Sequence, residues 1–168
     1  MLNVKKILYP TDFSKHSLAA LPYAKDLTEK FSAELHCLHV VDEAFQYWMA
    51  GSDNAVPIVV SDDELMEAAR RQMDQFVQKH WKEPEPSITT SLQIGRPFLE
   101  IIHYAKENQI DLIIIATHGR GALASMLLGS VAEKVVRKAP CPVLTVRHTD
   151  HQFEMPSFHR ISDLPFTI

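Results

Sequence analysis

The chain has 168 residues, of which 46% are hydrophobic, 23% charged and 8% aromatic. Its 17 Lys and Arg against 21 Asp and Glu give a net charge of −4, and general nucleic-acid binders normally carry a basic excess instead. The length fits one domain, and the composition excludes collagen-like, low-complexity and disulfide-framework proteins. We therefore expect one globular domain that does not bind nucleic acid.

The two cysteines, Cys37 and Cys141, lie far apart in the sequence, each within an apolar run. We interpret them as small core residues of a protein from a reducing compartment. No signal peptide is apparent, because Asp12 interrupts the first apolar stretch. The longest uninterrupted apolar run, residues 112–116, is far shorter than the roughly 20 residues that cross a membrane. These features predict a cytoplasmic protein without membrane association.

Short β-rich runs alternate with helical stretches along the chain. Strands are predicted at residues 4–9, 35–41, 88–94, 112–116 and 142–147. Helices are predicted from about residue 14, from the capping box at 61–64, from Pro97 and over 130–138. Pro22 predicts that the first helix is kinked or begins later. This order predicts an α/β fold, a single doubly wound domain with a five-stranded parallel sheet and helices on both faces.

Two segments fall outside this alternation. Residues 42–60 lose all periodicity, and so long a loop in a compact domain suggests a lid or a partner surface. Residues 149–168 form a tail that either docks on another surface or is frayed. We expect the domain to span residues 1–148.

In open α/β sheets, ligands bind beyond the carboxyl ends of the strands, where the strand order reverses. Two loops in such positions are chemically distinctive, residues 10–14 and residues 116–130. The second loop contains Gly119, Gly121 and Gly129, and glycines there let backbone N–H groups approach phosphate oxygens. The chain has no GxxxxGK[ST] motif and no GxGxxG after its first strand, so a P-loop is excluded and a dinucleotide-binding fold is disfavoured.

Several motifs, in the same order, resemble those of the universal stress proteins. They are residues 5–14, 38–42, 95–97, 111–121, 127–133 and 139–144. The resemblance covers about residues 3–147 and implies an adenine nucleotide alpha hydrolase-like fold. Members of the family that bind ATP carry the signature G-x2-G-x9-G-[ST].

Three residues of this chain fit that signature: Gly119, Gly129 and Ser130. The position of the first glycine is occupied by Ala116. We expect its methyl group to crowd the ribose or the first phosphate. If the position requires a positive φ, the alanine is also strained by roughly 1 kcal/mol. We favour ATP binding over its loss.

The resemblance implies a role for each part of the site. Asp12 and the backbone of Pro10 and Thr11 meet the adenine end, and Val40 packs on the base. Backbone N–H groups near Gly119, Gly129 and Ser130 hold the phosphates, and we infer from its position that Arg120 adds charge there. A Mg or Mn ion is carried by the phosphates rather than by a protein cage. The expected site is Pro10, Thr11, Asp12, Val40, Ala116, Thr117, His118, Gly119, Arg120, Gly129, Ser130 and Val131.

Other uses of these residues remain open. Ser130 begins an S-x-x-E capping box, so its hydroxyl is expected to cap a helix, which competes with a phosphate contact. Asp12 either caps the first helix or binds the ligand, and His118 either contacts phosphate or is a solvated loop residue. His36 and His39 lie three apart on a strand and face opposite sides, so they cannot chelate one metal ion, and we predict no metal site.

We predict a small ATP-binding regulatory protein of the stress response. Nucleotide occupancy is expected to set the conformation of the 116–130 loop and to change the binding of an unidentified protein partner. The chain shows no catalytic constellation, so at most slow ATP hydrolysis is expected. The family resemblance also implies a homodimer formed through the last strand, residues 143–146, which is otherwise an unpaired apolar edge. The alternative, supported by Ala116, is a dimeric interaction module that binds no nucleotide.

Overall fold

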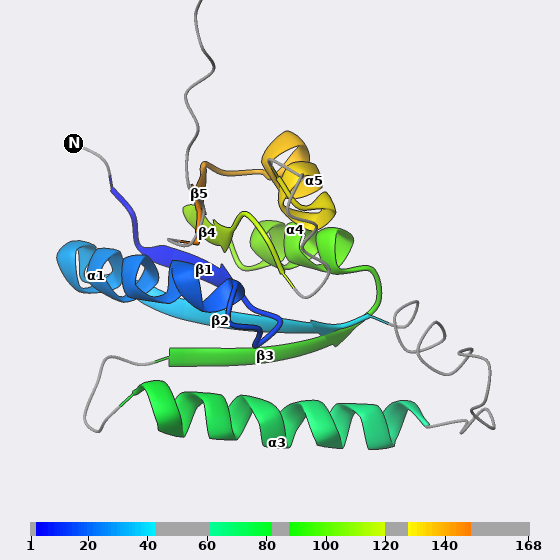
Figure 1. Cartoon of the computed structure of the whole chain (residues 1–168). Helices are drawn as coiled ribbons and strands as arrows, with labels where there is room; N and C mark the ends of the chain where they lie inside the picture. Colours follow the sequence, from blue (N-terminus) through cyan, green and yellow to red (C-terminus); the bar gives the residue numbers. More distant parts are fainter. Residues whose placement is uncertain (1–2, 43–60, 82–87, 120–127, 149–168) are drawn as a thin grey trace, which may run out of the picture.

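A computed structural model describes residues 3–42, 61–81, 88–119 and 128–148. Five strands form one parallel sheet in the order β3-β2-β1-β4-β5 (Figure 1). They are β1 (Lys6–Pro10), β2 (Glu34–Val41), β3 (Ile88–Ile94), β4 (Leu112–Ala116) and β5 (Val143–Val146). The predicted doubly wound α/β class is confirmed, and each strand bound lies within two residues of its prediction.

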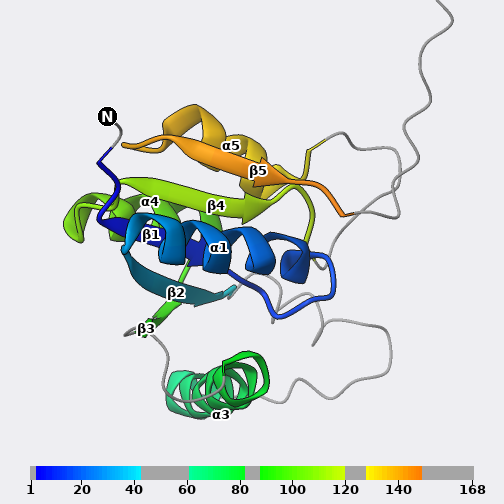
Figure 2. The ribbon, with the colours of Figure 1, turned by 90° about the vertical axis from the view of Figure 1, so that its left-hand side faces the viewer.

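Helices cover both faces of the sheet (Figures 1 and 2). One face is covered by η1 (Ser17–Ala20), α1 (Leu21–Phe31) and α3 (Asp62–His80), whose buried side chains join one apolar cluster. The other face is covered by α4 (Pro97–Glu107) and α5 (Ser130–Lys138), which bury a second cluster. Ile113 and Ile114 of β4 are fully buried, one in each cluster, as the all-apolar sequence of this strand predicts.

The first helix begins later than residue 14, as Pro22 indicates. A short 3-10 turn at Ser17–Ala20 precedes α1, and Pro22 lies in the first turn, where its missing N–H costs nothing. The helix ends at Ser32, which has a left-handed φ of 51° and directs its N–H to the carbonyls of Thr28 and Glu29.

The capping box that opens α3 is also confirmed. Ser61 accepts a hydrogen bond from the backbone N–H of Glu64, whose carboxylate accepts one from the N–H of Ser61. Leu65, Ala69, Met73 and Phe76 recur at helical spacing along α3 and form an apolar stripe. Ala69 and Met73 are buried, whereas Leu65 is only partly buried. Leu65 lies outside the apolar cluster that holds Met73 and Phe76, so this end of the helix is not part of the core.

Cys37 is buried in the core, as expected, and Cys141 is half-buried. Within the described ranges, no helix is long and apolar enough to cross a membrane. The predicted lid at 42–60 and the tail at 149–168 lie outside the described residues, apart from Asp42, as do Arg120 and Gly121.

Candidate functional site

A cavity of about 530 Å³ lies at the carboxyl ends of β1, β2 and β4. Strand β1 lies between β2 and β4 in the sheet, and the chain runs outward from β1 in both directions. The cavity therefore lies at the point where the strand order reverses. Every described residue of the predicted site lines it: Pro10, Thr11, Asp12, Val40, Ala116, Thr117, His118, Gly119, Gly129, Ser130 and Val131. Two loops and a strand end that are distant in sequence thus meet around one volume, within the size range of small-molecule sites.

The loop after β1 is held by bonds within its own turn. The N–H of Phe13 donates to Oγ1 of Thr11 at 3.0 Å, and the N–H of Ser14 donates to Oδ1 of Asp12 at 3.0 Å. Phe13 has a φ of 62°, a conformation that bulky residues rarely adopt. Its ring packs against His39 in a tilted arrangement at a centroid distance of 4.4 Å, and Nδ1 of His39 lies 2.8 Å from the carbonyl oxygen of Thr11. This packing fixes Asp12 at the cavity wall.

Asp12 does not cap the first helix. The residue before η1 is His16, which makes no side-chain capping bond, and Asp12 instead closes the turn through Ser14. The helical alternative for Asp12 is therefore wrong, because the helix begins too far along the chain for its carboxylate to serve as a cap.

The described glycines of the second loop are sites of close approach. A Cβ atom on Gly119 would lie 2.6 Å from Oδ2 of Asp12. A Cβ atom on Gly129 would lie 2.9 Å from the carbonyl oxygen of Thr117, which accepts the N–H of Gly129 at 2.7 Å. The absence of a side chain at Gly119 lets it approach the loop after β1, and the absence of one at Gly129 lets the start of α5 approach the end of β4. Both close approaches are between atoms of the protein itself.

Helix α5 spans the predicted range 130–138, but its capping residue differs from the expected one. Gly129 occupies the cap position with φ −67° and ψ 152°, and Ser130 is the first helical residue and makes no capping bond. The predicted cap at Ser130 is wrong because the carbonyl of Gly129 accepts the N–H of Glu133 at 2.9 Å, which places the helix start one residue earlier. Since Ser130 and Val131 line the cavity, the unpaired N–H groups of this first turn lie at its wall.

Ala116 fits its place without backbone strain. It is the last residue of β4, its φ is not positive, and only 6% of its surface is exposed. It packs in the same apolar cluster as Ala20 and Ile114. The condition for the expected strain, a positive φ at Ala116, is therefore not met.

Helices α3 and α4 also contribute to the cavity, which the sequence pattern does not reveal. Their residues at the wall are Leu65, Ala68, Ala69, Gln72, Pro97 and Ile101. The apolar stripe of α3 is the available signal, because it continues to Leu65, beyond the part of the helix that the core buries.

The histidines of β2 face opposite sides, as predicted. His36 contacts Tyr104 of α4, whereas His39 contacts Phe13 on the other face of the sheet. His118 lies at the cavity with its Nδ1 3.0 Å from Oγ1 of Thr117. Among the residues that the structure describes, no group of three His, Cys, Asp or Glu side chains is placed to hold a metal ion.

A family model described as "Universal stress protein family" matches residues 3–147. The chain belongs to the universal stress protein family. It is 34% identical over 143 residues to Universal stress protein MJ0531 of Methanocaldococcus jannaschii, a match that covers 85% of this chain and 82% of the relative. The solved structure of protein MJ0577 from the same organism is 31% identical and superimposes with a TM-score of 0.72, over 89% of this chain and 99% of that one.

More distant family structures share the fold and hold nucleotides. One from Arabidopsis thaliana, with AMP bound, is 20% identical with a TM-score of 0.56, and the match covers 92% of this chain and 97% of that one. One from Archaeoglobus fulgidus is in complex with dAMP and is 18% identical, with a TM-score of 0.55 over 87% of this chain and 99% of that one. A further universal stress protein is in complex with cAMP and is 22% identical, with a TM-score of 0.58 over 86% and 97% of the two chains.

Proposed function

We propose that this universal stress protein binds an adenine nucleotide, ATP in the first instance, in the cavity at the carboxyl ends of β1, β2 and β4. The observation that carries the proposal is that the residues expected from the ATP-binding signature and those expected from the loop after β1 line the same cavity. Family structures that hold AMP, dAMP and cAMP support the adenine class of ligand.

The chemistry of the cavity suits the two ends of a nucleotide. Its apolar wall includes Val40, Ile101 and Ile115, which suit the faces of a purine base. The first turn of α5 offers backbone N–H groups and the positive end of a helix dipole to the phosphates. Because Ser130 is not the cap, its hydroxyl can serve as a further phosphate donor. A Mg or Mn ion would be carried on the phosphates, since the described residues offer no cage of their own.

We propose that nucleotide binding changes how the chain binds a protein partner and that it does not serve a catalysed reaction. Bound phosphates would bridge the loop after β4 and the start of α5, which meet at the hydrogen bond between Gly129 and Thr117. The chain acts as a nucleotide-dependent switch.

We also propose a homodimer formed through β5, which lies at the edge of the sheet. Analytical ultracentrifugation that finds a monomer at all concentrations would overturn this proposal.

Calorimetry with Mg·ATP tests the binding directly. The wild-type chain should release heat on titration, and nucleotide should appear in the supernatant when freshly purified protein is denatured. Asp12→Asn should weaken affinity by about tenfold or more, because one charge-assisted hydrogen bond contributes about 1.5–3 kcal/mol. Asp26→Asn, at an exposed position of α1, is the matched control and should leave affinity unchanged. Absence of both heat and co-purified nucleotide would favour the interaction module that binds no nucleotide.

A further inference from the structure

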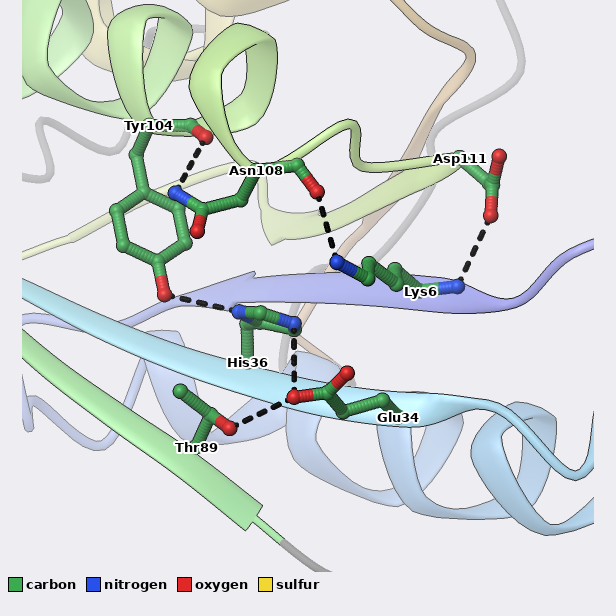
Figure 3. Close-up of polar contacts among 7 residues, drawn as sticks. All are labelled: Lys6, Glu34, His36, Thr89, Tyr104, Asn108 and Asp111. Atoms are coloured by element: carbon green, nitrogen blue, oxygen red, sulfur yellow. Dashed lines mark hydrogen bonds and ion pairs between the residues drawn. The ribbon is translucent and has the colours of Figure 1, made fainter.

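A buried polar cluster links β2 to α4 on the face of the sheet that carries α4 and α5 (Figure 3). His36 is only 3% exposed, and its Nδ1 lies 2.8 Å from the hydroxyl oxygen of Tyr104 on α4. Its Nε2 lies 3.3 Å from Oε1 of Glu34 without satisfying hydrogen-bond geometry. Thr89 of β3 donates to the same carboxylate oxygen at 2.8 Å. The buried imidazole ring of His36 thus has one hydrogen-bond partner, the Tyr104 hydroxyl, and one nearby carboxylate, that of Glu34.

A further charged group near His36 comes from β1. Nζ of Lys6 donates to the carbonyl oxygen of Asn108 at 3.2 Å (Figure 3). The neighbouring apolar side chains Leu8 and Leu38 are fully buried. Among the described groups of this shell, the Glu34 carboxylate is the anion that opposes the cost of burying an imidazolium ion.

Burial is the largest influence on His36 and lowers its pKa from the ordinary value. The carboxylate of Glu34 acts in the opposite direction, and the charge of Lys6 adds to the effect of burial. Because the folded pKa lies below the unfolded one, the unfolded chain takes up the proton first as the pH falls. Folding stability is therefore complete above about pH 6.5, the ordinary histidine value, and declines below it.

We propose that His36 is an acid-responsive tie between α4 and the sheet, and that its protonation releases α4 and weakens ligand binding in the cavity. In the neutral form, the Tyr104 hydroxyl donates to Nδ1 and the Nε2–H faces Glu34. Protonation places a hydrogen on Nδ1, so the Tyr104 hydroxyl must accept there and turn its own proton away from the ring. The charged ring regains water only when α4 moves away, so acid favours that open state.

The same two elements form a wall of the cavity. Leu38 shares the face of β2 with His36 and lines the cavity two residues further along. Ile101 lies one turn before Tyr104 on α4 and also lines it. Movement of α4 at Tyr104 therefore reaches the ligand through Ile101. This second step rests on the proposed nucleotide binding, whereas the release of α4 does not.

The test compares His36→Gln with His103→Gln in the full chain. His103 is an exposed residue of the same helix and controls for the loss of any histidine. Urea unfolding is measured from about pH 7.5 to about pH 5. Relative to His36→Gln, the folding constants of wild type and of His103→Gln should fall progressively below about pH 6.5, by at most about tenfold per pH unit. Parallel curves for all three proteins would overturn the proposal.

Two further measurements keep the outcomes distinct. Proton exchange of the α4 amides, corrected for intrinsic rates, should accelerate in acid in wild type and not in His36→Gln, and equal protection would refute the release of α4. If His36→Gln does not fold, the imidazole titration of wild type decides, since burial should make His36 titrate below the ordinary histidine value. The affinity for Mg·ATP should fall more in acid for wild type than for His36→Gln. If neither wild type nor His36→Gln binds ATP at neutral pH, the proposed nucleotide binding fails. The unfolding curves then still test the proposed acid-responsive link between His36 and α4.

Discussion

Replacing Gly129 by alanine tests the idea that this glycine is required by the protein's own packing. The new Cβ atom would lie 2.9 Å from the carbonyl oxygen of Thr117, and both partners are backbone, so neither can swing aside. The φ of −67° suits alanine, so no backbone strain is involved. The contact can relax only by lengthening the 2.7 Å hydrogen bond between the N–H of Gly129 and the same oxygen.

The expected cost follows from these contacts. Overpacking costs about 1–3 kcal/mol, and weakening one hydrogen bond costs up to about 1 kcal/mol. Removing a glycine from the unfolded chain returns about 0.4–1 kcal/mol. We therefore expect Gly129→Ala to lower the free energy of unfolding by about 1–3 kcal/mol.

Urea unfolding followed by circular dichroism measures this change. The comparison assumes that the free energy of unfolding depends on urea concentration with the same slope in the variant and the wild type. Ser130→Ala is the matched control, because the neighbouring hydroxyl makes no capping bond and its loss should change stability by less than about 0.5 kcal/mol. An equally small change for Gly129→Ala would refute the packing argument and leave phosphate approach as the reason for glycine at this position.

Three other predictions concern separate features. Ala116→Gly should tighten the binding of Mg·ATP in calorimetry, because the methyl group at the cavity wall is removed; unchanged or weaker affinity would show that this methyl is no obstacle. Ser32→Gly should raise the free energy of unfolding by about 0.5–1 kcal/mol, because the left-handed C-cap with φ 51° favours glycine, and Ser32→Ala should give no gain. Burial raises the pKa of the Cys37 thiol to about 12, so iodoacetamide at mildly alkaline pH should label it only after unfolding; rapid labelling of the native protein, seen by peptide mass spectrometry, would contradict this.

Much of the fold follows from local patterns in the sequence. The all-apolar run of β4 and the capping box at Ser61 each carry a signal within a few residues, and both elements form as predicted. Pro22 predicts the late start of α1 because proline is tolerated only in the first turn of a helix. The alternation of strands and helices then leaves few topologies, since parallel crossovers are right-handed.

The parts that sequence reasoning missed depend on contacts between distant segments. The approach of Gly119 to the carboxylate of Asp12 has no local signal, because it arises when two strand-end loops meet. Ser130 fits a capping box, yet Gly129 occupies the cap because its carbonyl pairs with Glu133, and the pattern alone does not distinguish a helix start from one residue earlier. The left-handed backbone of Phe13 accompanies a packing contact between its ring and His39, which residue preferences cannot indicate.

The most direct test of the account is a backbone amide NMR titration of the full chain with Mg·ATP. Chemical shifts should move for Asp12, Gly119 and Ser130 around the cavity, while Glu34 and Asp111 at the opposite ends of the strands should stay in place. No perturbation at millimolar nucleotide, or shifts confined to the opposite edge of the sheet, would contradict nucleotide binding at this site.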